Sequence, residues 1–353
     1  MTATEAVSTP TPTAPLATTA VMLTEMAAGY VGTRTLQIGL ESGLIEALAA
    51  HPDSAAWTLA SEAGTDPFYT RVWLTAAIAH GLVERSGDEG ARLADNVSTL
   101  LLAAGHPAHM GALFRVLEEP EIFARFHDRL ATGTRTWWDE CGPRFIDKVA
   151  GTGLPFYVRL VRDGLAAAGE AHELLDSGGV VLDTACGAGA GLVELAQAFP
   201  RARVVGVDGD AHSIALARDR IVDAGLDGRV SVTQTALEDL ALDARFDVVI
   251  NNIAMHECRD IDEVTRRVRT HLKPGGWFVI SDFPFPDNDE ALRSLPGRVM
   301  SGIQFFEAQI DDQLQPVGAY LELLSRHGFD RVGTVALTPM HAITFGRRPL
   351  PPG

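Results

Sequence analysis

The sequence predicts an α/β protein with a doubly wound, Rossmann-like and mostly parallel sheet, preceded by a mainly helical, winged-helix-like domain. From residue 178 onward, short apolar segments alternate with amphipathic ones, as is typical of parallel strands joined by helices. A Gly-rich turn follows the first of these apolar segments. Residues 18–105 instead contain successive helical patterns and then two short β-like segments.

Composition excludes several classes of partner. The chain has 353 residues, of which 46% are hydrophobic, enough for two domains with sizeable cores. A net charge of -17 repels the phosphates of nucleic acids and anionic lipids, so neither is expected as a partner. Three widely separated cysteines (Cys141, Cys186 and Cys258) indicate reduced thiols without zinc-binding spacing.

The beginning of the chain and its longest apolar runs indicate where the protein is located. Residues 1–17 are rich in Thr, Ala and Pro and lack the basic and apolar regions of a signal peptide. We expect them to form a disordered tail. No apolar run approaches the roughly 18 residues that span a bilayer. The sequence therefore predicts a soluble, cytoplasmic protein.

Residues 18–105 are expected to form the winged-helix-like domain. Winged helices often bind DNA, but between residues 51 and 95 seven acids stand against only three bases, whereas DNA-binding surfaces are basic. We therefore expect this domain to serve dimerisation and to cover a substrate pocket. The expected elements are helices at 21–31 and 36–48, a helix–turn–helix at 58–78, and wing strands at 81–85 and 91–93.

A helical linker over residues 106–173 is expected to join the two domains and to cap the substrate. It contains an aromatic cluster that includes Trp137, Trp138 and Tyr157. Two adjacent Trp side chains cannot both face one helix core. One of them is therefore expected to line a cavity or a partner surface, although plain packing remains open for each.

Residues 174–349 carry the alternating pattern and are expected to form the doubly wound domain. Right-handed crossovers place the loops that follow parallel strands along one edge of the sheet, where ligands bind. The expected strands are 180–183, 202–208, 230–234, 246–251 and 277–282, with helices at 191–199, 211–224 and 261–272.

The first of these strands ends at Asp183 and leads into the Gly-rich turn. Small residues in such a turn let the backbone approach a ligand at a helix N-terminus. The second strand ends at Asp208, where a carboxylate is placed to accept hydrogen bonds from ribose hydroxyls. The register is D-x-A-x-G-x-G, not the G-x-G-x-x-G of dinucleotide folds. An acid at the strand end suits a ligand with a sulfonium and an ammonium better than a pyrophosphate.

Four segments resemble the class I S-adenosylmethionine-dependent methyltransferases: 181–189, 205–208, 246–249 and 272–276. With the N-terminal half, the chain resembles their O-methyltransferase branch, which carries a winged-helix dimerisation domain. The resemblance implies S-adenosyl-L-methionine as cofactor, S-adenosylhomocysteine as product, a small-molecule acceptor and a homodimer.

On this resemblance, ten residues are expected to contact the cofactor. Two positions in this region depart from the family pattern. Ala185 replaces the first loop glycine, which is tolerable if its φ is negative. Ala236 stands where an acid usually meets the adenine amino group, so Glu238 or backbone groups are expected to take over. The ten residues are Tyr157, Asp183, Ala185, Gly187, Asp208, Gly209, Leu237, Glu238, Asn251 and Asn252.

The resemblance also places the chemistry. His256 follows the fourth strand, where the family carries a His that removes the proton of an acceptor hydroxyl, and its ordinary pKa suits that role. Asp282 matches the acid that orients this His, and Glu307 is a candidate second orienting acid. The expected substrate-binding residues are Trp137, Trp138, Met255, Met300, Ile303, Gln304 and Phe306. For Met300, Ile303 and Phe306, simple core packing remains open.

The leading hypothesis is O-methylation of a small molecule in bacterial secondary metabolism. One alternative is C-methylation of an activated carbon, such as that of a 2-oxo acid. Relatives that do this with a metal use His and acid ligands. Here the only such group is His256 with Glu257 or Asp282, without a second well-placed histidine. No metal is therefore predicted. A non-methylating enzyme of the same fold is a third possibility, and a DNA-binding sensor is a fourth that the acidic N-terminal region disfavours.

Overall fold

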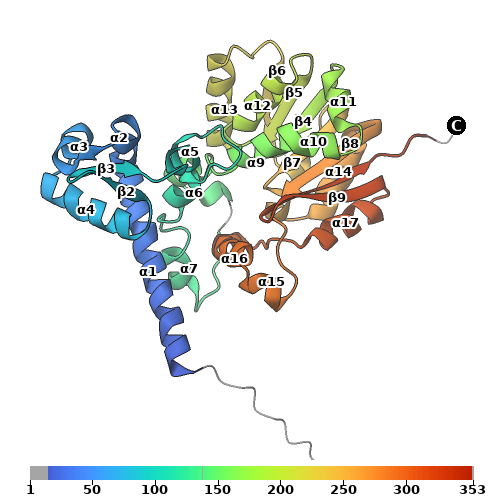
Figure 1. Ribbon diagram of the computed structural model, residues 1–353. Helices are drawn as coiled ribbons and strands as arrows, with labels where there is room; N and C mark the ends of the chain where they lie inside the picture. Colours follow the sequence, from blue (N-terminus) through green and yellow to red (C-terminus); the bar gives the residue numbers. More distant parts are fainter. Residues whose placement is uncertain (1–14, 137, 352–353) are drawn as a thin grey trace, which may run out of the picture. The chain divides into compact units, whose positions relative to one another are not determined.

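A computed structural model describes residues 15–136 and 138–351 of the chain. They divide into two compact units, of which the first ends at Ser98 and the second begins at Thr99 (Figure 1). The sequence pattern placed this boundary a few residues later, at residue 105. Trp137 and residues 1–14 lie outside the described residues.

The first unit begins with a single long helix, α1 (Leu16–Glu41). The prediction of separate helices at 21–31 and 36–48 was therefore wrong. The helix is continuous through residues 32–35 and is interrupted only near Gly43, whose φ of 75° ends the helical path. Leu16 and Ala17, expected in the tail, are already helical. The remaining elements are α2 (Leu44–Ala50), β1 (Ser54–Ala55), α3 (Ala56–Ala63), α4 (Pro67–Ala79), β2 (Val83–Ser86) and β3 (Gly90–Leu93).

The expected helix–turn–helix and wing strands are present in this unit. Gly64 ends α3 with a φ of 66°, and Asp66 caps α4 by accepting hydrogen bonds from the backbone N–H groups of Phe68 and Tyr69. β3 pairs antiparallel with both β1 and β2 in a three-stranded sheet. These are the turn and hairpin that the residue types predict locally.

The second unit opens with short helices, as expected for the linker. A π-helical turn, η2, directly continues α9. These elements are α5 (Val97–Leu102, which begins just before the boundary), α6 (Gly111–Val116), α7 (Ala124–Arg129), η1 (Trp138–Glu140), α8 (Pro143–Val149), α9 (Leu154–Arg159), η2 (Leu160–Gly164), α10 (Leu165–Ala167) and α11 (Ala171–Asp176).

A seven-stranded sheet follows, in the order β6-β5-β4-β7-β8-β10-β9. Its first five strands in sequence are parallel and confirm the predicted strands. The exception is the start of β8, which lies at Leu272 and not at residue 277 as predicted. The last two strands were not predicted, and β10 pairs antiparallel with both β8 and β9. The strands are β4 (Val180–Asp183), β5 (Arg203–Asp208), β6 (Val230–Gln234), β7 (Phe246–Asn252), β8 (Leu272–Asp282), β9 (Asp330–Thr338) and β10 (His341–Arg347).

The connections between the strands supply the other helical elements. Asp210, Asp260, Asn288 and Ser294 cap four of them with side-chain oxygens. These elements are α12 (Ala190–Ala198), α13 (Ala211–Asp223), η3 (Leu237–Asp239), η4 (Met255–Glu257), α14 (Ile261–His271), α15 (Asp289–Arg293), α16 (Leu295–Glu307), η5 (Ala308–Ile310) and α17 (Val317–Arg326).

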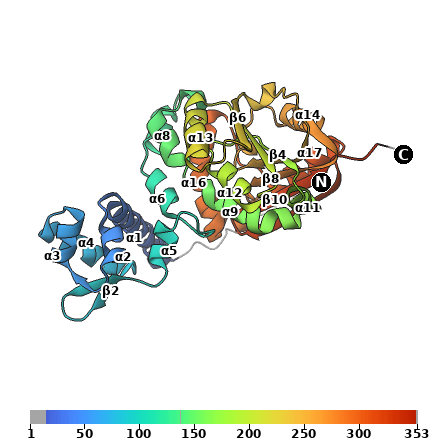
Figure 2. The ribbon, with the colours of Figure 1, turned by 90° about the horizontal axis from the view of Figure 1, so that it is seen from above.

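Hydrophobic side chains cover both faces of the sheet, which confirms the doubly wound fold. On one face, Val181, Ile250 and Val279 pack with side chains from α9 and α12. On the other face, Leu182 and Phe278 pack with side chains from α14 and α17. Figure 2 shows the sheet between these two groups of helices. Each fully buried Leu contributes about 1.5–3 kcal/mol, so this packing rigidly holds the carboxyl ends of the strands.

Candidate active site

The loop after β4 brings backbone close to the carboxyl edge of the sheet. Gly187 and Gly189 have positive φ values of 49° and 79°, and a Cβ on Gly189 would lie 2.9 Å from the Cβ of Ala217. Glycine is therefore required where the chain turns against α13. Ala185 is not among the described residues with positive φ, so alanine replaces the usual glycine there without strain.

Asp183 ends β4 as a fully buried carboxyl. The hydroxyl of Tyr157 donates to its Oδ2 at 2.7 Å. Burial raises the pKa of Asp183 to about 7, although the Tyr157 hydrogen bond acts in the opposite direction. Tyr157 packs against Gly191, where a Cβ would lie 2.3 Å from the ring. A buried carboxyl of this kind is ready to be stabilised as a carboxylate by a cationic ligand.

Asp208 occupies the end of β5, the strand beside β4, two residues beyond Gly206, which pairs with Asp183. Its Oδ2 accepts from the backbone N–H of Gly187 at 2.8 Å and its Oδ1 from that of Asp210 at 2.9 Å. Each carboxylate oxygen keeps a second lone pair for a ribose hydroxyl. Burial raises the pKa of this carboxyl as well. The exposed Gly209 leaves room beside it, because a Cβ there would meet nothing closer than 3.8 Å.

The expected adenine region lies in the turn after β6. Ala236 is exposed, and Leu237 and Glu238 are half-buried in the turn that follows it. The Oε1 of Glu238 accepts from the backbone N–H of Arg259 at 3.0 Å. This contact uses one oxygen of Glu238, so Glu238 and backbone groups both stay candidate adenine partners.

Asn251 and Asn252 end β7 as buried side chains. Asn251 Nδ2 donates to the hydroxyl of Thr184 at 3.1 Å, while Asn252 Oδ1 accepts from that of Ser281 at 2.7 Å. Among the described residues, Asn251 Oδ1 and Asn252 Nδ2 have no hydrogen-bond partner. One unpaired acceptor and one unpaired donor therefore stand at the ligand-binding edge. With the two carboxyls and the open glycines, they fit a nucleoside that carries a cationic amino acid.

A strained turn after β7 carries His256. Ile253 has a φ of 54°, which is costly for a β-branched residue, and its backbone N–H donates to the carbonyl of Ser281. The short helix η4 then places His256 beside the end of β8. Its Nδ1 lies 2.8 and 2.9 Å from the two carboxylate oxygens of Asp282. The tertiary structure thus brings together the two residues expected to form the catalytic pair.

Asp282 is itself held in place. Tyr320 donates its hydroxyl at 2.6 Å and Phe283 its backbone N–H at 2.8 Å. Both Asp282 and His256 are only 3% exposed. Because Asp282 accepts the Nδ1 proton, His256 Nε2 is the nitrogen left for a reacting group. Tyr320 was not expected from the sequence, since only the packing of α17 brings it to this carboxylate.

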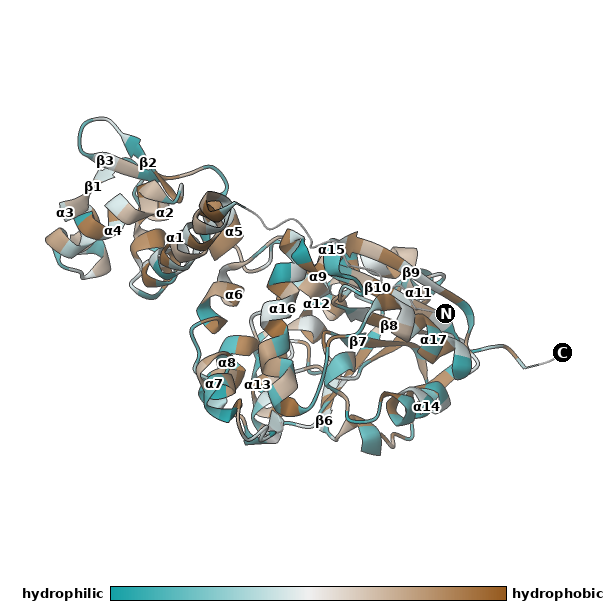
Figure 3. Cartoon of the chain, turned by 90° about the horizontal axis from the view of Figure 1, so that it is seen from below, coloured by the Kyte–Doolittle hydropathy of each residue, from teal (hydrophilic) through white to brown (hydrophobic). Residues whose placement is uncertain are grey.

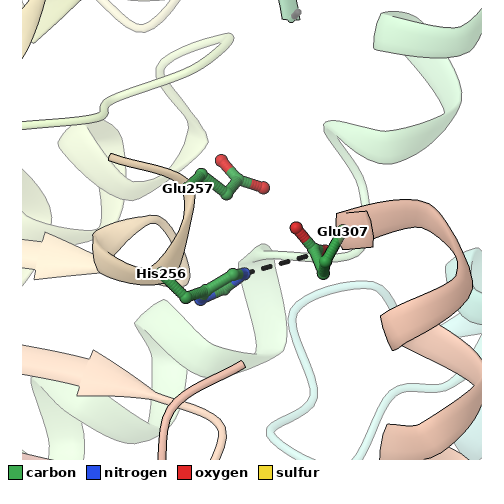
Figure 4. A group of neighbouring side chains, drawn as sticks. All are labelled: His256, Glu257 and Glu307. Carbon is green, nitrogen blue, oxygen red and sulfur yellow. Dashed lines mark ion pairs between the residues drawn. The ribbon is translucent and has the colours of Figure 1, made fainter. Parts of the chain in front are cut away.

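Glu307, at the end of α16, approaches His256 from the opposite side. Its Oε1 lies 3.7 Å from His256 Nε2. Ligand atoms of His256, Glu257 and Glu307 all lie within 4.8 Å of one another, and Figure 4 shows the three side chains turned toward a common point. In the described structure, the other oxygen of Glu307 has no hydrogen-bond partner.

Charges in this cluster shift several pKa values. Burial by itself would lower the pKa of His256, but the negative charges of Asp282 and Glu307 outweigh it and raise that pKa well above its usual value. Burial, together with the charge of Glu307, raises the pKa of Glu257 well above the ordinary range and that of Asp312 to about 7. Asp312 was missed by the sequence analysis because nothing in its local pattern marks it.

The expected substrate-binding residues divide into four groups. Met255 is fully buried among core side chains between the sheet and α14, which corrects its placement in the pocket wall. Trp138 and Phe306 pack against each other, with ring centroids 5.2 Å apart, in an apolar cluster with Phe145. Trp138 and Phe306 therefore pack as core residues, which is the alternative that the sequence left open. Trp137 lies outside the described residues.

The remaining three expected substrate-binding residues lie on α16. Met300 is buried and Ile303 is half-buried. Gln304 uses its amide to hold the following loop, since it accepts from the backbone N–H of Leu314 at 3.0 Å and donates to the carbonyl of Asp312 at 3.2 Å. Gln304 therefore positions Asp312 beside Glu307, and its amide keeps one further donor and one further acceptor site.

Comparison with known proteins agrees with this fold. Residues 175–318 match the model of a methyltransferase domain. A 3-hydroxy-5-methyl-1-naphthoate 3-O-methyltransferase from Streptomyces sahachiroi is 28% identical over 312 residues, which cover 84% of this chain and 88% of that protein. An O-methyltransferase family protein from Burkholderia thailandensis has a similar structure, with a TM-score of 0.72 and 18% identity, covering 94% of this chain and 98% of the other.

Human N-acetylserotonin methyltransferase, solved in complex with S-adenosylmethionine, superposes with a TM-score of 0.71 at 16% identity, covering 94% of this chain and 98% of the other. Fold and site thus define a class I, O-methyltransferase-like protein. The chain is an S-adenosylmethionine-dependent methyltransferase that acts on small molecules, and S-adenosyl-L-methionine is its cofactor.

Proposed function

We propose that the enzyme methylates a hydroxyl group of a small, partly apolar acceptor in bacterial secondary metabolism, with His256 as the general base. The observation that carries this proposal is the buried pair of His256 and Asp282, which leaves Nε2 available to a reacting group. The similarity to an O-methyltransferase that acts on a hydroxynaphthoate supports an aromatic hydroxyl as the acceptor.

Different residues bind the cofactor and accept the proton of the acceptor. Asp183, Asp208 and the backbone of the Gly-rich loop hold the cofactor. When bound, S-adenosylmethionine supplies an electrophilic methyl group. His256 Nε2 accepts the proton of the acceptor hydroxyl, so the oxygen gains the electron pair with which it attacks. Asp282 keeps the Nδ1 proton in place and stabilises the imidazolium that forms.

Turnover with hydroxynaphthoates and other phenols tests this function. We expect formation of S-adenosylhomocysteine together with a methoxy product, identified by the carbon chemical shift of its new methyl group. Phenols blocked at the hydroxyl should not react, because they offer no proton to His256. A product methylated at carbon, or cofactor binding without any S-adenosylhomocysteine, would refute the proposal.

One observation favours a second candidate, metal-assisted C-methylation of a 2-oxo acid. His256, Glu257 and Glu307 offer three ligand atoms within 4.8 Å, and the Nδ1–Asp282 contact is the arrangement that metal-bound imidazoles use. Metal analysis of the purified protein separates the two functions. Stoichiometric divalent metal with chelator-sensitive turnover of 2-oxo acids favours this candidate, whereas chelator-insensitive methylation of phenols favours the first.

We further propose that the first unit forms a homodimer through α1. Its exposed large apolar side chains include Met22, Met26 and Tyr30, and Figure 3 shows apolar residues in brown on this helix. Residues four apart share one side of a helix, and an exposed apolar stripe of this kind is typical of a partner surface. At about 1.5 Å per residue, its 26 residues form a long surface. Only three of those residues are charged, so a second copy can pair there without repulsion.

Light scattering during gel filtration checks the dimer. The wild type is expected at twice the mass of the chain, and the double variant M22E/M26E at the mass of one chain, because buried glutamates oppose the contact. Ser61→Glu, at an exposed position of α3, adds charge to the same unit and should remain dimeric. A monomeric wild type would contradict the proposal.

We also propose that the enzyme is located in the cytoplasm. The three cysteines are reduced thiols in the structure, which is compatible with a reducing compartment. Among residues 15–136 and 138–351, none of the helices has both the length and the apolarity to cross a bilayer.

A further inference from the structure

Four polar side chains form a continuous buried chain of hydrogen bonds that the proposed proton transfer does not use. Arg159 Nε lies 3.0 Å from His341 Nδ1. His341 Nε2 lies 2.7 Å from the hydroxyl of Ser281, which lies 2.7 Å from Asn252 Oδ1. This series of hydrogen bonds connects α9 with three adjoining strands, β10, β8 and β7. Of its members, His341, Ser281 and Asn252 are at most 4% exposed.

Every hydrogen bond in this chain has a defined direction. A guanidinium can only donate, so His341 Nδ1 must accept and its Nε2 must carry the proton. Nε2 then donates to the Ser281 oxygen, and the single hydroxyl proton of Ser281 is left for Asn252 Oδ1. His341 remains neutral, because burial and the nearby charge of Arg159 lower its pKa to about 3.

Aromatic contacts hold the outer end of the chain. The Arg159 guanidinium lies 4.5 Å from the ring centroid of Phe156. That ring packs edge-on against His341 at 4.8 Å and against Phe283 at 5.1 Å. Arg159 also donates to the carbonyl of Pro107. The guanidinium is therefore fixed in place, and so is the direction of the chain that it starts.

The consequence is the orientation of the Asn252 amide. With Oδ1 occupied, Nδ2 carries two protons that have no acceptor among the described residues. Such a buried donor is costly unless a ligand pairs with it. Side chains two residues apart on a strand share a face. Asn252 therefore lies on the face of Ile250, and Asp183 on that of Val181, which is the same side of the sheet.

We propose that Asn252 Nδ2 binds the carboxylate of the cofactor's methionine group, with Ser281, His341 and Arg159 as positioning residues that orient the amide. The amino-acid end of the cofactor carries an ammonium and a carboxylate on one carbon. Asp183 suits the ammonium, and Asn252 supplies a donor on the neighbouring strand, β7. The sulfonium and the ammonium cannot accept a hydrogen bond, which leaves the carboxylate as the matching group.

Calorimetry with two ligands tests this inference, which rests on cofactor binding and not on the identity of the acceptor. S-adenosylhomocysteine has the carboxylate, whereas 5′-methylthioadenosine lacks the whole amino-acid group. Asn252→Leu should weaken S-adenosylhomocysteine about 10- to 100-fold, as expected for a lost hydrogen bond to a charged group. The affinity for 5′-methylthioadenosine should stay at the wild-type level.

Ser281→Ala provides the second arm, because it leaves Asn252 in place but frees its amide to rotate. We expect this variant also to lose affinity for S-adenosylhomocysteine and not for 5′-methylthioadenosine, but by a smaller factor than Asn252→Leu. Equal weakening of both ligands would mean that these residues only support the fold and would overturn the proposal. Unchanged binding of S-adenosylhomocysteine would also overturn it, since the amide would then be satisfied by water or protein.

Discussion

Replacing His256 with Gln is expected to lower kcat by about two to four orders of magnitude, the usual loss when a general base is removed. Glutamine can still donate a hydrogen bond toward Asp282, but it cannot accept a proton at accessible pH. The affinity for S-adenosylmethionine should not change, because His256 lies outside the residues expected to hold it. Single-turnover rates and calorimetry measure the two quantities separately.

The matched control is His127→Gln, at a largely exposed position, which should leave both quantities at wild-type values. A near-normal rate for His256→Gln would contradict the assignment. It would mean that proximity alone drives the reaction or that the acceptor is an already activated carbon.

The pH profile gives an independent view of the same residue. The negative charges of Asp282 and Glu307 raise the pKa of His256 well above its usual value despite burial, so its imidazole loses its proton at a higher pH than an ordinary histidine does. Only the neutral form can accept a proton, and kcat/KM is therefore expected to rise with pH and to level off only on the alkaline side. Asp282→Asn should move this rise to lower pH while decreasing the maximal rate. A profile that is flat from acid to alkaline pH would exclude His256 as the base.

Asp183→Asn is expected to weaken S-adenosylmethionine about 10- to 100-fold, because a charge-assisted hydrogen bond to a cation is replaced by a neutral one. The amide can keep the hydrogen bond from Tyr157, so the fold should survive, and thermal melting verifies this. In the free protein, burial raises the pKa of Asp183 to about 7. The cation needs the carboxylate form, so wild-type affinity should fall as pH drops below 7.

Calorimetry in buffers of different ionisation enthalpy measures this linkage. Wild-type binding near neutral pH should release a proton, and binding by Asp183→Asn should be less dependent on pH. Asp223→Asn, at an exposed position of α13, is the matched control and should bind as the wild type does. Equal affinity in Asp183→Asn, or wild-type binding that is independent of pH, would exclude this carboxyl as the partner of the cation.

Most of the fold and part of the site follow from local patterns. The five parallel strands were predictable because buried strands are short apolar runs bounded by turn residues. Asp183, Asp208 and Asp282 could be placed together because each ends such a strand, and the carboxyl ends of parallel strands share one edge. His256 was predicted from resemblance, and the pairing with Asp282 agrees with that prediction.

Other features depend on contacts between distant residues. β9 and β10 were missed because β10 enters between β8 and β9 in an antiparallel direction, which no local pattern encodes. Met255 was expected to line a pocket, yet it packs in the hydrophobic core. Trp138 and Phe306, for which core packing stayed open, also pack in a hydrophobic cluster. An apolar residue at helical spacing looks the same in a core and in a pocket wall.

The residues alone were thus sufficient for the five parallel strands, for the Gly-rich loop after Asp183 and for the sheet edge that carries the proposed site. Folding decided which groups surround that edge: Tyr320 on Asp282, Glu307 and Asp312 near His256, and Arg159 and His341 behind Asn252. The physical reason is that hydrogen bonds and charge interactions depend on distance and direction in space, and helices α9, α16 and α17 approach the sheet only after their apolar faces have packed.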